Sequence, residues 1–135
     1  MNTKRFCLAS LATFIFIFAF DFVFHGILLK GLYEQTMHLW RPEDEYMKLM
    51  HWSLASQILF VVMFGWIFLK GYENKGPLEG IRYGVLIGLL FSSLYIGMYS
   101  YKPISLELVI AWVAGGIVEL GLAGGIFALI YKPKI

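Results

Sequence analysis

The stretch FCLASLATFIFIFAFDFVFHGILL occupies residues 6–29 and sets the class of the protein. Apolar side chains fill it almost without interruption, and Asp21 and His25 are the exceptions that carry chemistry. A helix rises about 1.5 Å per residue, so this run is long enough to cross a hydrocarbon layer of about 30 Å. Lys4 and Arg5 precede it as in a signal peptide, but the run exceeds the usual hydrophobic region of about 7–15 residues. We therefore predict an uncleaved membrane span.

Three further segments have the same character. The predicted spans cover residues 6–30, 50–70, 81–101 and 105–131, and the whole chain, 1–135, forms one domain. The chain is 59% hydrophobic and only 15% charged, whereas soluble domains average about 25% charged residues. Its net charge of +2 and its lack of a basic stretch argue against a nucleic-acid partner. The sequence predicts an all-α, polytopic membrane protein, a bundle of four transmembrane helices in two antiparallel hairpins, with the lipid bilayer as its partner.

The distribution of basic residues predicts the orientation. With the N-terminus in the cytoplasm, more lysines and arginines lie on the inner side than on the outer side, as the positive-inside rule requires. The inner set is Lys4, Arg5, Lys70, Lys75, Arg82, Lys132 and Lys134, and the outer set is Lys30, Arg41, Lys48 and Lys102. Both termini are then cytoplasmic, and Trp40 and Trp112 are expected at the outer interface.

Small residues recur every four positions in the last two spans. Gly80, Gly84 and Gly88 mark one face of the third span, and Gly121 and Gly125 do so in the fourth. Helices in lipid associate through close backbone approach, so these glycines are predicted packing positions within the bundle. A contact with a second copy, or with a partner in a membrane complex, is the alternative.

Polar side chains fall near one level in all four predicted spans. Asp21 and Glu119 lie in the first and fourth spans, Gln57 in the second, and Ser92 with Ser93 in the third. Ionisable groups inside a membrane are costly and are by default functional candidates. His25 follows Asp21 by four residues and therefore shares its helix face. The candidate ligand-binding or ion-binding residues are Asp21, His25, Gln57, Ser92, Ser93 and Glu119.

Two hypotheses for these residues remain open. In the first, they bind or conduct a proton, a metal ion or a small ligand. In the second, the chain is a structural or accessory membrane subunit whose buried polar groups only specify helix packing. No motif of catalysis is present, so an enzyme is not expected.

A second polar cluster is predicted outside the membrane. Glu34 and His38 are four residues apart on an expected helical extension of the first span, and His51 opens the second. Carboxylate and imidazole groups can bind a divalent metal, so these three are candidate metal ligands. A haem between His25 and His51 is a further alternative. The sequence does not favour either cofactor over a solvated surface.

The sequence also resembles a known group of proteins. The matching segments are FDFVFHGILL at 20–29, LYEQT at 32–36 and LWRP at 39–42, and the likeness continues through Tyr83-Gly84 and Trp112 to Glu119. These segments resemble a family of small bacterial four-span membrane proteins grouped as a domain of unknown function. The resemblance implies the bacterial inner membrane and supplies no activity.

Overall fold

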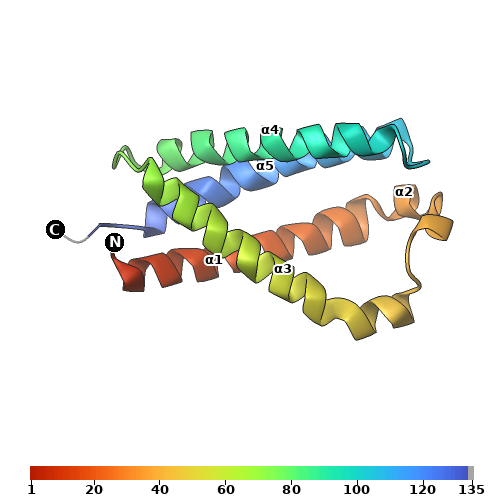
Figure 1. Ribbon diagram of the computed structural model, residues 1–135, viewed down its shortest axis with the longest axis horizontal. Helices are drawn as coiled ribbons and strands as arrows, with labels where there is room; N and C mark the ends of the chain where they lie inside the picture. The colour runs from red at the N-terminus through yellow and green to blue at the C-terminus, as the bar shows by residue number, and fades with distance from the viewer. Residues whose placement is uncertain (134–135) are drawn as a thin grey trace.

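The protein is a bundle of four long helices, seen in a computed structural model that describes residues 1–133 (Figure 1). Lys134, assigned above to the inner side, lies outside the described residues. The elements in chain order are α1 (Thr3–Val23), a π-helical turn η1 (Phe24–Leu28), α2 (Lys30–Glu34), a 3₁₀ turn η2 (Met37–Leu39), α3 (Glu43–Lys70), α4 (Pro77–Tyr99) and α5 (Leu106–Ile130). Each of the four segments Thr3–Leu28, Glu43–Lys70, Pro77–Tyr99 and Leu106–Ile130 is long and apolar enough to span a membrane. The predicted all-α, multi-pass membrane fold is confirmed.

The α4–α5 hairpin is the tightest contact in the bundle. Gly80 and Gly84 of α4 lie so close to α5 that a Cβ on either would overlap a backbone carbonyl, that of Gly124 or Leu120. A Cβ on Gly88 would come within 2.8 Å of the Ile117 Cα. Close backbone contact of this kind is how helices associate where lipid gives no hydrophobic drive.

The expected packing glycines of α5 also face α4. A Cβ on Gly121 would lie 3.2 Å from Val85, and one on Gly125 would lie 2.9 Å from Ile81. Gly124, which the spacing did not single out, makes the closest approach of the three. These glycines contact α4 within the hairpin, so they do not form a free surface for a second copy of the protein.

The start of α1 and the end of α5 lie at one end of the bundle, which we call the terminal end, and the α1–α3 and α4–α5 connections lie at the other, the far end (Figure 1). Aromatic rings fill the terminal half. The ring of Phe127 meets Phe6 edge-on at 5.8 Å between centroids and Phe68 at 5.7 Å, and it stacks on Tyr131. Phe127 is fully buried, so this half is a closed apolar core.

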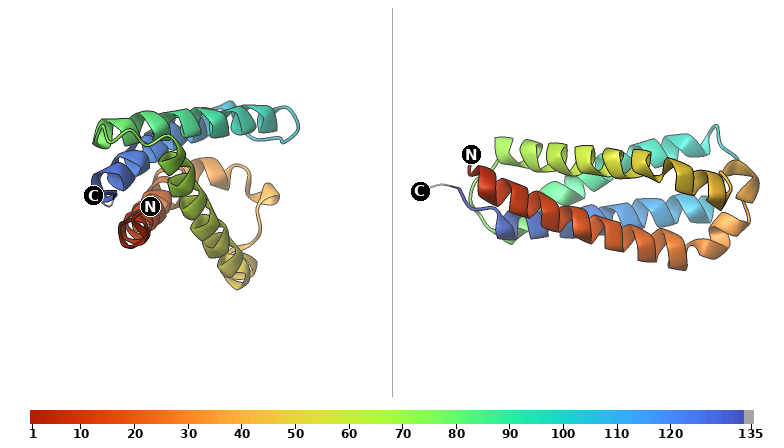
Figure 2. Two further views of the ribbon diagram at one scale, coloured as in Figure 1. Left: turned by 60° about the vertical axis from the view of Figure 1, so that its left-hand side comes forward. Right: turned by 90° about the horizontal axis from the view of Figure 1, so that it is seen from below.

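Helix α3 packs over only part of its length. Its buried residues are Val61, Phe64, Gly65 and Phe68, all in its second half. Its first turns diverge from α4 and α5 toward the far end, as Figure 1 and the left view of Figure 2 show. The bundle is therefore tight at the terminal end and open at the far end.

One sequence expectation about the α1–α3 connection needs correction. Helix α3 contains the span expected at 50–70 and begins earlier, at Glu43, because Pro42 precedes it and three acidic residues suit a helix N-terminus. The expected helical extension of the first span ends at Glu34. Thr36 is in a non-helical conformation, and its hydroxyl bonds back to the carbonyls of Leu32 and Tyr33.

Candidate functional site

The first span contains a π-helical turn where the candidate site begins. In η1 the amide of Leu29 donates to the carbonyl of Phe24 at 2.9 Å, a bond between residues five apart. Such turns are rare and occur mostly as single bulges in α-helices, frequently at functional sites. His25 lies inside this turn, and its side chain is half-buried.

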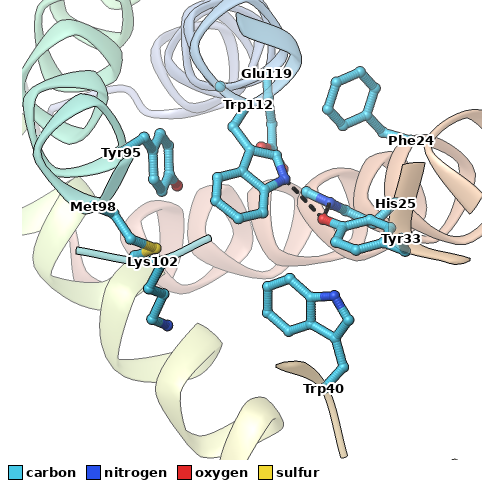
Figure 3. Close-up of a pocket in the computed structure, with 10 residues that line it drawn as sticks. Phe24, His25, Tyr33, Trp40, Tyr95, Met98, Lys102, Trp112 and Glu119 are labelled. Carbon is cyan, nitrogen blue, oxygen red and sulfur yellow. Dashed lines mark hydrogen bonds between the residues drawn. The ribbon is translucent and has the colours of Figure 1, made fainter. Parts of the chain in front are cut away.

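Both ring nitrogens of His25 have partners. Nδ1 lies 2.6 Å from the hydroxyl of Tyr33, and Nε2 lies 3.5 Å from Oδ1 of Asp21. The Tyr33 oxygen also accepts the indole N–H of Trp112 at 2.8 Å. Figure 3 shows the part of this chain that runs from Trp112 of α5 through Tyr33 of α2 to His25 of η1, and Asp21 of α1 continues it.

One set of hydrogen-bond directions satisfies every group in this chain of contacts. Burial raises the pKa of the Tyr33 hydroxyl to about 12, so it keeps its proton at neutral pH. The Tyr33 oxygen accepts from Trp112, and its O–H donates to Nδ1 of His25 when the ring carries its proton on Nε2. A neutral His25 then carries its proton on Nε2, where it faces the Asp21 carboxylate.

Two carboxyl groups meet next to this histidine. The Asp21 and Glu119 side chains are close enough to share a hydrogen bond when one of them carries a proton. Oε1 of Glu119 is buried and has no hydrogen-bond partner among the described residues. A buried carboxylate oxygen without a donor is costly, so the site is incomplete without a proton or a ligand.

A cavity of about 230 Å³ opens beside this cluster at the far end of the bundle. His25 and Glu119 contribute to its wall, and Lys102 of the α4–α5 connection lies at its edge and is exposed. Helix α3 contributes no residue to the cavity, which fits its divergence at this end. Figure 3 shows the lining, which is completed by Phe24, Tyr33, Trp40, Tyr95, Met98, Trp112 and Gly116.

Aromatic rings form most of the cavity wall. Tyr33, Trp40 and Trp112 make a cluster with centroid separations of 5.5, 6.3 and 6.4 Å, and Tyr95 adds a ring 5.7 Å from Trp112. The Trp40 indole N–H donates to the Thr36 hydroxyl at 3.0 Å, which holds the 3₁₀ turn against the site. Trp112 is only 9% exposed, so its ring contacts protein, and its expected depth near the outer interface stays a prediction.

The structure brings together three of the six candidate residues, Asp21, His25 and Glu119. Gln57 is elsewhere: its amide donates to the Phe14 carbonyl at 3.2 Å and ties α3 to α1. The hydroxyls of Ser92 and Ser93 donate to carbonyls of their own helix, at Gly88 and Leu90. A common depth in the membrane is therefore not enough to predict that polar residues of four helices meet, because the helix face on which a residue lies also decides where its side chain points.

The candidate metal ligands do not form a cluster. Glu34, His38 and His51 are all exposed, and residues 1–133 contain no group of three His, Cys, Asp or Glu side chains placed to hold a metal ion. The break at Thr36 separates Glu34 from His38. For haem, both nitrogens of His25 face other side chains, so this arrangement does not present a free nitrogen to iron.

Sequence reasoning missed the residues that come from outside the spans. Tyr33 follows His25 by eight residues, a helical spacing that was a usable signal. Lys102 and Trp40 come from connections, whose paths cannot be read from periodicity. No family model matches the chain, and no curated protein or solved structure shows significant similarity to it.

Proposed function

We propose that the protein binds a small organic cation in the cavity at the far end of its transmembrane bundle. The observation that carries this proposal is the Glu119 carboxyl group, whose buried Oε1 lacks a hydrogen-bond partner and which lines a cavity with aromatic walls. Asp21 adds a second carboxyl group beside it. A carboxylate next to the faces of aromatic rings is an arrangement that recognises an ammonium group.

The physical basis is the field inside the cavity. The faces of Trp and Tyr rings attract cations within about 6 Å of their centroids, by about 2 kcal/mol or more where water is excluded. The Glu119 carboxylate in the cavity lining supplies negative charge, and Asp21 lies beside it. Lys102 is exposed at the edge, where water screens its charge, so it does not neutralise this negative charge.

The size of the cavity limits the ligand. Pockets for drug-sized molecules measure roughly 300–1,000 Å³, and this cavity measures about 230 Å³. The ligand is therefore a small amine or quaternary ammonium ion. Because the edge of the cavity is formed by connections at the far end, the ligand enters from the water on that side.

The alternative hypothesis, that the polar residues only specify packing, explains some of them. Gln57 joins two helices, and the hydroxyls of Ser92 and Ser93 donate hydrogen bonds to backbone carbonyls of α4. It does not explain Glu119, which faces a cavity and leaves an oxygen without a donor. Glu119 therefore favours ligand binding over a purely structural role.

The location follows from charge and resemblance. The excess of basic residues at the terminal end supports cytoplasmic termini, and the resemblance to small bacterial membrane proteins supports the inner membrane. The cavity then opens to the outside of the cell.

Cysteine labelling tests this orientation. In a Cys7→Ser background, Lys102→Cys should react with an impermeant maleimide in intact cells, and Lys132→Cys should not. The reverse pattern would invert the orientation.

Tryptophan fluorescence tests ligand binding. Trp52 and Trp66 lie outside the cavity and are exposed, so Trp52→Phe and Trp66→Phe leave Trp40 and Trp112 as reporters. Tetramethylammonium should change their emission in a saturable way, and the neutral isostere neopentane, or the more soluble neopentyl alcohol, should not. An equal response to both, or none to the cation, would overturn the proposal.

A matched pair of variants locates the effect. Glu119→Gln should weaken tetramethylammonium binding about tenfold or more, a loss of about 1.4 kcal/mol. Glu107→Gln removes an exposed carboxylate from the first turn of the same helix and should leave binding unchanged. Equal losses in both variants would indicate a general surface-charge effect rather than this site.

A further inference from the structure

Glu119 lines the cavity and Asp21 lies beside it, and this pair of carboxyl groups decides how many protons are exchanged when a ligand binds. Asp21 and Glu119 lie within hydrogen-bonding reach of each other, and two carboxylates this close repel, although the Asp21 side chain is 46% exposed. One proton between them removes the repulsion. The empty site is therefore most stable with a single proton on the pair.

The neighbours of the pair decide which carboxyl group holds this proton. Nε2 of His25 lies 3.5 Å from Oδ1 of Asp21, and with Tyr33 on the other ring nitrogen the imidazole N–H is placed beside this carboxylate, which favours its charged form. Glu119 has no such donor at Oε1. Asp21 is thus the ionised member, and Glu119 is the protonated member that donates to it.

We infer that the cavity exchanges an organic cation for a proton at Glu119. The inference rests on the proposed function and adds the stoichiometry. A cation entering the cavity stabilises the charged form of Glu119, and the O–H bond of its carboxyl group breaks. The proton leaves to water in the cavity, which Glu119 lines, so one positive charge enters as one leaves.

The other groups that face the pair do not supply this proton. His25 is neutral in the arrangement above, and the hydroxyls of Tyr33 and Tyr95 are the phenolic groups nearby. Lys102 is the cationic side chain at the edge of the cavity. Among the described residues, no hydrogen bond or ion pair joins it to Asp21 or Glu119. Helix α3 places no charged side chain in the cavity lining.

Calorimetry measures the exchanged proton directly. Tetramethylammonium is titrated into the full-length protein in detergent, in buffers of matched pH and different ionisation enthalpy, from pH 5 to pH 9. We expect close to one proton released per cation bound in the lower part of this range. The apparent affinity should rise toward tenfold per pH unit there and then level off.

Variants separate this inference from the proposed function. Glu119→Gln should bind more weakly, with no proton release and no dependence on pH. Proton release that persists in Glu119→Gln and disappears in His25→Gln would assign the proton to the imidazole and overturn the inference. Wild-type binding without proton release at any pH in the range would also overturn it and leave cation binding intact. Absence of binding in the wild type would overturn both.

Discussion

The hydroxyl of Tyr33 accepts a hydrogen bond from the indole of Trp112 at 2.8 Å, although the two residues are 79 positions apart. This bond joins the short helix α2, which comes after the first span, to the fourth span. The same hydroxyl lies 2.6 Å from His25. Tyr33 therefore connects the wall of the cavity to the imidazole that lies beside the Asp21 carboxylate.

Removing this hydroxyl should weaken both binding and folding. In Tyr33→Phe, the Trp112 N–H loses its acceptor and His25 loses the bond that fixes its tautomer. We expect tetramethylammonium affinity to fall about tenfold and stability to fall by about 1–2 kcal/mol, the typical cost of an unsatisfied buried group. Tyr101→Phe, at an exposed position of the same end, is the control. Thermal unfolding and fluorescence titration measure the two effects, and wild-type values for both would contradict this role.

The α4–α5 contact should be intolerant of a single methyl group. In Gly84→Ala the new Cβ would overlap the backbone of Leu120, which cannot move without displacing α5. We expect a loss of about 2 kcal/mol or more, as in overpacked cores. Gly97→Ala has nothing within 4 Å of its Cβ and should be neutral or slightly stabilising. Denaturation in detergent compares the two, and equal stabilities would show that the hairpin is not packed as described.

Alkaline pH should destabilise the fold through Tyr33. Burial raises its pKa from 10.0 to about 12, so the stabilisation that depends on its proton is complete below pH 10 and is lost as pH rises toward 12. The melting temperature should fall across this window, and the fall should be smaller in Tyr33→Phe. Tyr101→Phe serves as the control and should behave as the wild type does. A Tyr33→Phe profile identical to the wild type would exclude this contribution.

The protein should not conduct ions through the arrangement described here. In the part of the bundle formed by residues 1–133, the cavity extends over only part of the bundle's length. The terminal half of the bundle is filled by Phe6, Phe68, Phe127 and Tyr131. Proteoliposomes containing the wild type should therefore show no steady proton or cation current above that of empty liposomes. A steady current that Asp21→Asn and Glu119→Gln both abolish would contradict a closed binding site and support a conduction pathway.

The sequence predicted the spans because their signal is local. Long apolar runs and the glycine spacing in residues 80–88 depend only on neighbours along the chain, and the structure contains both features. The meeting of Asp21 with Glu119 was also within reach, because both are isolated ionisable residues in apolar helices. Burial makes such groups pair with each other.

The rest of the site depended on information that periodicity does not carry. Gln57 and Asp21 have the same expected depth. However, α3 diverges from the cavity, and the Gln57 amide donates to the Phe14 carbonyl instead. The π-helical turn at residues 24–28 adds a residue to one helical turn and redirects the chain after it, including Tyr33. Trp40 reaches the cavity only because Thr36 breaks the helix before it.

Anomalous diffraction from crystals containing tetramethylarsonium would show whether the cavity holds an organic cation, because arsenic marks the position of the cation without assumptions about its contacts. We predict one peak in the cavity, within about 6 Å of the Trp112 and Tyr95 rings and beside Glu119, which loses occupancy in Glu119→Gln crystals and keeps it in Glu107→Gln crystals. A peak elsewhere in the protein, or a cavity peak that survives Glu119→Gln unchanged, would contradict cation binding at this site.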